Sequence, residues 1–358
     1  MFDTDDAKDR VLHELIGEVE APGLAVAICG RNGILWHHAR GHADAERSVP
    51  VDLDTPFGTG SITKTFTAAA ILALRDDGIL KLDEPLVESI PEAAALRYPT
   101  KDSAPITLRH LLTHTSGLPR GVRDLRGELH REPNDDELLA HLASVRMARA
   151  PGVDDEYSNL GFALLGIVVA RRSGQPYASF IKERILDPLG MTTSTFAPEV
   201  LGEHLATPHK NRDGVLGPNR LWEHAAYTPV GGLYASTRDV IRWISFQLAA
   251  WPPRDDPDPA RPLRRATVRE SHRVGGLHRI GRRGKGLGWS IKADSPLGEI
   301  VWHNGGLPMG YAAFCAFEPT VGVGLVALTN ALVDMDDRMF KTLAKYAVSR
   351  GLVEDRRR

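Results

Sequence analysis

The chain has 358 residues, enough to bury a large hydrophobic core and to form two or more subdomains. Hydrophobic residues make up 42% of it and charged residues 25%, which is the composition of an ordinary globular protein. A net charge of -2 excludes the strongly basic surface that nucleic acid or an anionic membrane requires, so we expect neither as a partner.

The sequence contains no apolar run of about 18 residues that would span a bilayer. The segment Met1–Asp6 is acidic and polar, without the basic and apolar regions of a secretory signal. We therefore expect a cytoplasmic protein. The sequence does not indicate an oligomeric state.

Candidate metal ligands are few. Cys29 and Cys315 lie in apolar runs, which predicts buried, reduced thiols, and two cysteines alone do not make a structural zinc site. His110 and His114 have the i, i+4 spacing of a helical metal site, but no acidic residue stands between them as in zinc proteases. We expect no metal and no cofactor.

The first 60 residues predict a helix, a β-hairpin and a polar loop. Apolar side chains at helical spacing indicate the helix, and short apolar runs on both sides of an Arg-Asn-Gly turn indicate the hairpin. The expected segments are a helix over 5–20, strands over 24–29 and 34–36, and a loop over 41–56.

Helical patterns dominate the middle of the chain. The charged, proline-containing segment 119–136 interrupts them and is expected to be an exposed loop over the site. Thr107 is the expected N-cap of one helix, and Ser236 or Thr237 that of another. The expected helices cover 61–78, 106–114, 161–172, 177–186 and 239–248.

The C-terminal part returns to strand patterns. A segment rich in Pro, Asp and Arg over 251–265 indicates a surface linker. Four apolar runs separated by turn signals then predict an antiparallel meander, and an amphipathic helix follows. The expected strands cover 286–291, 300–303, 312–317 and 322–329, and the helix covers 334–350.

These elements predict an α/β (α+β) fold. Both chain ends supply strands of one antiparallel sheet with flanking helices, and the middle of the chain is an all-helical insert. The expected domains are a discontinuous α/β sheet domain, 1–60 plus 285–358, and a mainly helical domain, 61–250. Residues 251–284 are the expected linker and sheet-edge segment, and the active site is expected between the two domains.

Ser61 and Lys64 form the first candidate catalytic pair. They are three residues apart at the start of an alanine-rich helix, so they share one face of it. A buried amine that has lost its charge can accept the hydroxyl proton, and N–H groups at a helix N-terminus face a developing negative charge. A serine in this position is more often an N-cap, so the pair alone does not establish a nucleophile.

Tyr157 and Asn159 lie on a loop that enters the helix expected over 161–172. A phenol that a nearby ammonium acidifies can act as general base and then as acid toward the leaving group. The carboxamide of Asn159 offers both a donor and an acceptor to a substrate amide or ester. Taken alone, this triplet is better explained by a capping Ser158 between two ordinary residues.

The third motif is the run from His303 to Gly306, which follows an apolar, strand-like segment. Glycines there let a substrate backbone lie close to the strand, and an exposed N–H can complete an oxyanion hole. A protonated His303 can bind a carboxylate, or it can polarise the tyrosine. Taken alone, a tight turn with a surface histidine is the simpler interpretation.

The three motifs, in this order, resemble those of the serine β-lactamase and penicillin-binding-protein superfamily. The branch is that of class C β-lactamases, D,D-peptidases and family VIII esterases, and the resemblance extends from about residue 21 to residue 330. It implies a β-lactamase/transpeptidase-like fold. Four further stretches are similar to family signatures: ITLRHLLTHTSGLP (106–119), YSNLGFALLG (157–166), PLGM (188–191) and GGLYASTRD (231–239).

The resemblance implies the roles of three catalytic residues. Ser61 would be acylated, Lys64 would assist its deprotonation, and Tyr157 would be the general base and acid. No deacylating glutamate is identified by any family motif, so activation of water would fall to Tyr157 as well.

The resemblance also implies the substrate-binding residues. Asn159 would hold the acyl-side amide, His303 and Gly305 would line the strand edge, and the N–H groups of Ser61 and Gly306 would form the oxyanion hole. Many β-lactamases have lysine where this chain has His303. A neutral imidazole binds a carboxylate less strongly than an ammonium, which favours esterase and peptidase relatives.

The predicted function is that of a serine hydrolase that forms an acyl-enzyme at Ser61 and hydrolyses small esters or amides. The expected partner is a small-molecule ester, amide or β-lactam. The same machinery serves β-lactamases, D-amino-acid peptidases and acyltransferases, and the sequence does not separate them. A catalytically silent binding protein of the same fold is the alternative, although its motifs should be eroded and all are intact here.

Overall fold

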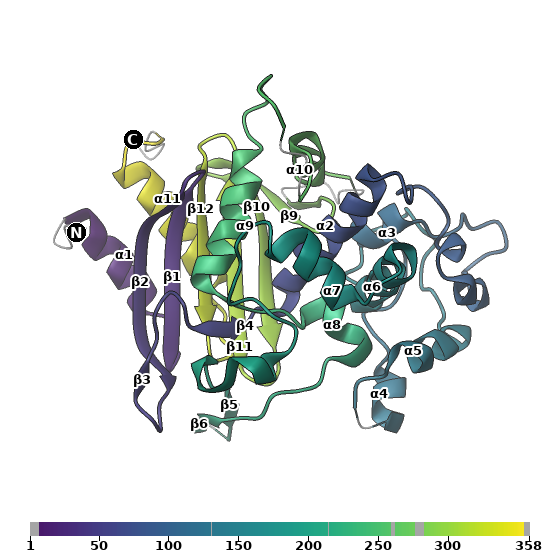
Figure 1. Ribbon diagram of the computed structural model, residues 1–358, viewed down its shortest axis with the longest axis horizontal. Helices are drawn as coiled ribbons and strands as arrows, with labels where there is room; N and C mark the ends of the chain where they lie inside the picture. Colours follow the sequence, from purple (N-terminus) through teal and green to yellow (C-terminus); the bar gives the residue numbers. More distant parts are fainter. Residues whose placement is uncertain (1–6, 130, 214, 259–261, 276–282, 354–358) are drawn as a thin grey trace.

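The computed structural model describes residues 7–129, 131–213, 215–258, 262–275 and 283–353, so the segment Met1–Asp6 lies outside the described residues. Its centre is an eight-stranded antiparallel sheet in the order β3-β2-β1-β12-β11-β10-β9-β8 (Figure 1). Both ends of the chain supply its strands, and this confirms the expected fold class. The strands are β1 (Gly23–Gly30), β2 (Gly33–Asp44), β3 (Val49–Pro50), β8 (Arg283–Lys285), β9 (Ser290–Ser295), β10 (Gly298–Leu307), β11 (Tyr311–Glu318) and β12 (Val323–Thr329).

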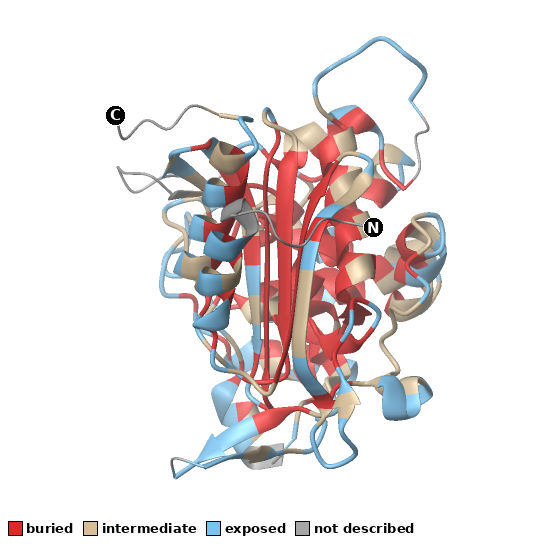
Figure 2. Ribbon diagram, turned by 90° about the vertical axis from the view of Figure 1, so that its left-hand side faces the viewer, coloured by how far each residue is buried: buried red, intermediate tan, exposed pale blue. Residues whose placement is uncertain are grey.

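The central strands are buried on both faces, because successive side chains point into two different cores. Along β12, Val326 and Leu328 belong to one core, whereas Leu325 and Ala327 belong to the other. Figure 2 shows these buried strands between helices whose outer surfaces are exposed. The second core is covered by α1 (Ala7–Gly17) and α11 (Asp336–Ser349), and the first by α9 (Thr237–Ala249) and the helical part of the chain.

The helical part packs on the first core and is built around two apolar helices, α2 and α6, which contact each other. Ser158 caps α6 by accepting a hydrogen bond from the Gly161 N–H, and Thr107 caps α3 as expected. The helices are α2 (Thr63–Asp76), α3 (Leu108–Leu112), α4 (Arg123–Leu129), α5 (Asp135–His141), α6 (Asn159–Ser173), α7 (Tyr177–Ile181), α8 (Thr228–Gly231) and α10 (Arg265–Ser271).

Two segments that were expected to be loops contain regular structure. Within 41–56, β2 continues to Asp44 and pairs with the short strand β3. This part of the sequence is polar because β2 is near the edge of the sheet and several of its side chains are exposed. Within 119–136, the chain forms the charged helix α4, which is anchored by the buried side chains of Val122 and Leu125. Two apolar residues are too few to produce a helical period in the sequence.

The strand expected over 286–291 begins later, at Ser290, and β8 precedes it. Residues between them are irregular because the chain passes directly over α2. Gly288 has a φ of +79°, and a Cβ there would lie 2.3 Å from the Cβ of Ala68. Only glycine can adopt this backbone conformation without strain and also leave room for α2.

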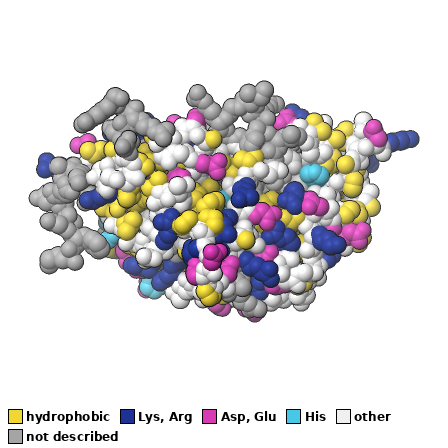
Figure 3. All heavy atoms as spheres, turned by 90° about the horizontal axis from the view of Figure 1, so that it is seen from above, with side chains coloured by type: hydrophobic (Ala, Val, Ile, Leu, Met, Phe, Trp, Pro, Cys, Tyr) yellow, Lys and Arg dark blue, Asp and Glu magenta, His cyan; other side chains and the backbone are white. Residues whose placement is uncertain are grey.

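The surface carries charges of both signs. Seen from above, basic and acidic side chains are intermingled (Figure 3), in keeping with the small net charge. Cys29 and Cys315 are buried and free, as expected, and burial raises the pKa of the Cys29 thiol to about 12. Within the described ranges, no helix has the length and apolar character needed to cross a membrane.

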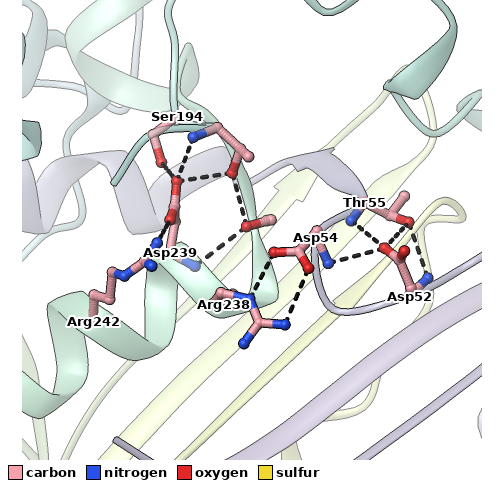
Figure 4. Close-up of polar contacts among 9 residues, drawn as sticks. Asp52, Asp54, Thr55, Ser194, Arg238, Asp239 and Arg242 are labelled. Atoms are coloured by element: carbon pink, nitrogen blue, oxygen red, sulfur yellow. Dashed lines mark hydrogen bonds and ion pairs between the residues drawn. The ribbon is translucent and has the colours of Figure 1, made fainter. Parts of the chain in front are cut away.

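Asp239, in the first turn of α9, connects this helix to the loop at Thr193 and Ser194 and to the end of the strand that precedes α9 (Figure 4). Its buried carboxylate accepts hydrogen bonds from the N–H and hydroxyl of Thr193 at 2.8 Å and from the hydroxyl of Ser194 at 3.0 Å, and it pairs with Arg242. The hydroxyl of Ser236, the N-cap, accepts from the Asp239 N–H. Ser236 ends β7 (Tyr234–Ser236), which pairs with β4 (Pro56–Gly58), the strand that leads to the candidate nucleophile.

We predict that Asp239→Asn lowers the free energy of unfolding by about 2 kcal/mol. The groups around the carboxylate all donate hydrogen bonds, and the NH2 group of asparagine cannot accept them. Urea unfolding measures the effect. The matched control is Asp54→Asn, which removes an exposed ion pair with Arg238. This control should lower the free energy of unfolding by less than about 0.5 kcal/mol. Equal losses in both variants would contradict the structural role given to Asp239.

Candidate active site

Ser61 lies at the entrance of α2, in a short 3-10 helix that spans Gly60–Ile62. The turn before it is fixed by Thr59, whose N–H and hydroxyl donate to the carbonyl of Leu233 at 2.9 and 2.8 Å. Strand β4 and the start of α2 are therefore anchored to the segment that leads into β7. This anchoring places the Ser61 hydroxyl at the boundary between the sheet and the helical part.

Lys64 is fully buried beneath Ser61. Its Nζ donates hydrogen bonds to the Ser61 Oγ at 2.8 Å and to the carbonyl of Val230 at 3.0 Å. Burial lowers the pKa of the Lys64 amine well below its ordinary value, and the charges of Arg120 and Lys285 lower it further. A neutral amine at this position is able to accept the hydroxyl proton of Ser61.

Tyr157 approaches Ser61 from the loop before α6, and its hydroxyl donates to the Ser61 Oγ at 2.9 Å. Burial raises the pKa of the Tyr157 phenol to about 12, although the contact with Ser61 and the charge of Arg120 oppose this shift. The expectation of an acidified phenol is therefore corrected. A protonated Tyr157 is suited to donate a proton, and the neutral Lys64 is the better base.

His114 supports Tyr157 and is not half of a helical metal pair with His110. Helix α3 ends at Leu112, and His114 has a φ of +58° outside it. Its ring stacks on Tyr157 with centroids 4.4 Å apart, and its Nδ1 accepts the N–H of Ser158 at 3.1 Å. Within the described residues, no group of three or more His, Cys, Asp or Glu side chains is arranged to hold a metal ion.

Asn159 is the first residue of α6, and its N–H donates to the carbonyl of Arg120 at 2.8 Å. Its side-chain Oδ1 is buried and has no hydrogen-bond partner in the described part of the chain. A buried acceptor without a partner is costly unless a ligand satisfies it. The Oδ1 of Asn159 is therefore an unsatisfied acceptor, although Asn159 is not among the residues that line the pocket over Ser61.

Gly305 on β10 packs directly against the turn that carries Ser61. A Cβ at Gly305 would lie 2.0 Å from the carbonyl oxygen of Thr59 and 3.0 Å from the N of Ser61. The glycine is thus required for the contact between the sheet and the nucleophile, in addition to any contact with substrate. Gly306, the next residue, lines the same pocket as Ser61.

His303 is not among the residues that line that pocket, although it lies on the same face of β10 as Gly305, two residues further on. Its side chain is buried, with 5% exposure, and its Nδ1 donates to the carbonyl of Asn304 at 2.6 Å. Burial lowers the pKa of His303 to about 3, and the charge of Lys64 adds to this effect. A neutral, buried imidazole cannot bind a substrate carboxylate as an ammonium would.

A pocket of about 550 Å³ opens over Ser61. One part of its wall comes from the helical region, another from β10 and β11, and a third from the segment after β12. The lining residues are Ser61, Arg120, Tyr157, Asn304, Gly305, Gly306, Ala312, Ala313, Leu332, Val333, Asp334, Met335 and Asp336.

Sequence reasoning did not identify Arg120 and Lys285 as site residues. Arg120 follows the stretch 106–119 and lies over the ring of Tyr157, with its Cζ 5.2 Å from the centroid. Lys285, on β8, places its Nζ 5.9 Å from the same centroid. In the sequence, Arg120 was indicated only by its place near the start of the segment expected to cover the site. No sequence feature indicated Lys285.

The fold matches that of penicillin-binding proteins and β-lactamases. The chain superposes on the octameric penicillin-binding protein homologue from Pyrococcus abyssi with a TM-score of 0.80 and 25% identity, over 96% of this chain and 77% of that one. It superposes on a β-lactamase/D-alanine carboxypeptidase from Pseudomonas syringae with a TM-score of 0.77 and 22% identity, over 95% and 98% of the two chains.

Sequence relatives point to the same group. The D-alanyl-D-alanine-carboxypeptidase/endopeptidase AmpH of Escherichia coli K12 is 31% identical over 256 residues, which are 68% of this chain and 62% of AmpH. The esterase EstB of Burkholderia gladioli is 34% identical over 268 residues, 65% of this chain and 67% of EstB. The family model for Beta-lactamase matches residues 9–348, so the chain belongs to the Beta-lactamase family. It spans less than two thirds of the length of AmpH.

We predict that Gly305→Ala lowers the free energy of unfolding by about 1–3 kcal/mol, because its Cβ collides with the Thr59 carbonyl. Thermal unfolding measures the loss. The matched control is Gly306→Ala, whose Cβ would meet only the end of the exposed Leu332 side chain at 3.0 Å. A larger loss at Gly306 than at Gly305 would contradict the packing described here.

Proposed function

We propose that the chain is a serine hydrolase that forms an acyl-enzyme at Ser61 and hydrolyses small esters or amides. The observation that carries this proposal is the convergence of two groups on one oxygen. The Ser61 Oγ is 2.8 Å from the Nζ of Lys64 and 2.9 Å from the hydroxyl of Tyr157, at the base of an open pocket. A nucleophile, a neutral base and a proton donor are thus in contact.

In the acylation step, the Ser61 Oγ attacks the carbonyl carbon and its proton passes to Lys64. The negative charge on the carbonyl oxygen is stabilised by the N–H groups of Ser61 and Gly306. The bond to the leaving group then breaks, and the leaving oxygen or nitrogen takes the proton of Tyr157. The Lys64 ammonium returns a proton to the phenolate, so both groups are neutral again.

In the deacylation step, water attacks the acyl carbon and gives its proton to the neutral Lys64. The tetrahedral intermediate collapses, the bond to the Ser61 Oγ breaks, and the oxygen regains a proton from the Lys64 ammonium. The acid product leaves. Assigning the base to Lys64 follows from the raised pKa of Tyr157, which keeps the phenol protonated near neutral pH.

The neutral state of His303 favours esters over β-lactams as substrates. Its buried ring offers no cation to a β-lactam carboxylate. The relatives include one named an esterase and one named a D-alanyl-D-alanine carboxypeptidase, and each supports one branch of the proposal. A D-amino-acid peptidase is therefore the second candidate.

We predict that Ser61→Ala abolishes acylation and leaves the fold intact. Intact-protein mass spectrometry after brief incubation with p-nitrophenyl butyrate detects the acyl adduct, and thermal unfolding monitors the fold. Near-normal ester turnover by the variant would contradict the assignment of the nucleophile. With the wild-type protein, fast turnover of a chromogenic cephalosporin would favour a β-lactamase over an esterase.

We predict that Arg120→Gln moves the acidic limb of the pH profile to higher pH. The charge of Arg120 lowers the pKa of Lys64, so its removal raises that pKa and the amine becomes neutral only at higher pH. The measurement is kcat/KM for p-nitrophenyl butyrate against pH. Arg123→Gln, an exposed arginine outside the pocket, is the control and should leave the limb in place.

The alkaline side of the same profile tests the role of Tyr157. A proton donor must stay protonated, and the pKa of Tyr157 is raised to about 12. Activity should therefore not fall until the pH approaches that value. A decline centred near the ordinary pKa of tyrosine, about 10, would argue that the phenol is acidified.

A further inference from the structure

The short helix α8 presents two consecutive carbonyl groups to one side of α2. The carbonyl of Val230 accepts a hydrogen bond from the Nζ of Lys64 at 3.0 Å. The carbonyl of Pro229 accepts one from the hydroxyl of Thr67 at 2.7 Å. Lys64 and Thr67 are three residues apart on α2, so both side chains reach α8 from the same face of that helix. The two contacts are therefore joined through adjacent peptide groups of α8.

The hydroxyl of Thr67 is oriented by a second buried hydroxyl, that of Tyr177 on α7. The two oxygens lie 2.7 Å apart. The carbonyl of Pro229 can only accept, so the hydrogen of Thr67 is directed at it and Tyr177 is the donor to Thr67. Burial raises the pKa of the Tyr177 phenol, which keeps this donor protonated. The hydrogen bonds thus run in one direction, from Tyr177 to Thr67 to Pro229.

Packing alone does not fix the position of α8. On one side Gly166 of α6 lies against it, because a Cβ at Gly166 would be 1.9 Å from the Cγ of Pro229. Beside this contact is a cavity of about 270 Å³, whose wall includes Thr228 and Pro229 of α8 and Ile167 of α6. The helix has only four residues, too few to be rigid through its own hydrogen bonds. A hydrogen bond from α2 is therefore needed to fix the direction of its carbonyl groups.

The direction of the Val230 carbonyl matters because it orients the amine of Lys64. A neutral amine has two N–H groups and one lone pair, and only the lone pair can accept a proton. When one N–H is bound to Val230, the lone pair can face the Ser61 hydroxyl, whose oxygen is 2.8 Å away. The same carbonyl stabilises the ammonium that forms when Lys64 has taken the proton.

We propose that Thr67 is a positioning residue: it fixes the Val230 carbonyl and thereby the amine of Lys64. Tyr177 supports Thr67 by donating to its hydroxyl. Thr67 is fully buried and is not among the residues that line the pocket over Ser61, so it acts through the lysine and not on the substrate. The inference rests on the proposed function, in which Lys64 is the base.

The first test uses Thr67→Val, which removes the hydroxyl and keeps the shape of the side chain. With p-nitrophenyl butyrate we expect kcat to fall about tenfold and KM to stay within about twofold, because the substrate pocket is untouched. The acidic limb of the kcat profile should move to lower pH by about half a unit, because the ammonium loses an acceptor and the pKa of Lys64 falls. Thr67→Ser keeps the hydroxyl and should restore both quantities. Tyr177→Phe should change them in the same direction by less.

Thr65→Val is the matched control. Thr65 is buried on the same helix, and its hydroxyl donates to the Ile62 carbonyl and accepts from the indole of Trp243, away from α8. The control should lower the midpoint of thermal unfolding to a similar extent and leave kcat and the acidic limb in place. In folded Thr67→Val, an unchanged kcat, or a limb that stays in place or moves to higher pH, overturns the inference. An equal change in Thr65→Val overturns it as well.

A measurement without substrate separates failure of this inference from failure of the proposed function. In protein isotopically labelled at the lysine ε-carbon, an NMR titration follows the ionisation of Lys64, whose resonance is identified by its loss in Lys64→Met. Thr67→Val should lower this pKa, and Thr65→Val should not. Both variants keep the charged and titratable neighbours that act on Lys64 or are acted on by it: His114, Arg120, Tyr157, Lys285 and His303.

The two proposals therefore fail in different ways. A pKa of Lys64 that depends on Thr67, in a protein whose Ser61 is never acylated, would overturn the hydrolase and leave the positioning role standing. Acylation of Ser61 together with a pKa that is the same in the wild type and in Thr67→Val would overturn the positioning role and leave the hydrolase standing.

Discussion

The burial of one amine, that of Lys64, is the constraint on which the rest of the site depends. A lysine without solvent is tolerated only where its Nζ has partners, and here those are the Ser61 hydroxyl and the Val230 carbonyl. The first partner comes from the 3-10 helix that precedes α2 and the second from α8. The same burial that costs stability removes the positive charge and makes the amine a base.

Much of the fold follows from periodicity in the sequence. The strands that form the centre of the sheet are apolar on both faces, and their alternating side chains divide between two cores, so β11 and β12 could be placed within a few residues. The polar second half of β2 and the charged helix α4 could not be predicted from the sequence. Their apolar contacts are too few to give a period, and neighbouring elements in the fold stabilise them instead.

The sequence predicted those site residues that lie close together along the chain. Ser61 and Lys64 are close because a helix brings them together, whereas the approach of Tyr157 required the family resemblance. Arg120 and Lys285 reach the same ring from separate segments with long side chains. The burial of His303 depends on what packs against β10, and sequence alone does not give this.

The pairing of β1 with β12 has a consequence for synthesis. These strands are joined across the whole chain, and the N–H of Gly23 donates to the side chain of Asn330 at 2.7 Å, 307 residues away. Strand β1 therefore leaves the ribosome long before β12, one of its two neighbours in the sheet, has been synthesised. During this interval β1 can pair only with β2, and its other edge is uncovered. An uncovered strand edge can pair with another chain, so the unfinished protein is open to aggregation at this stage.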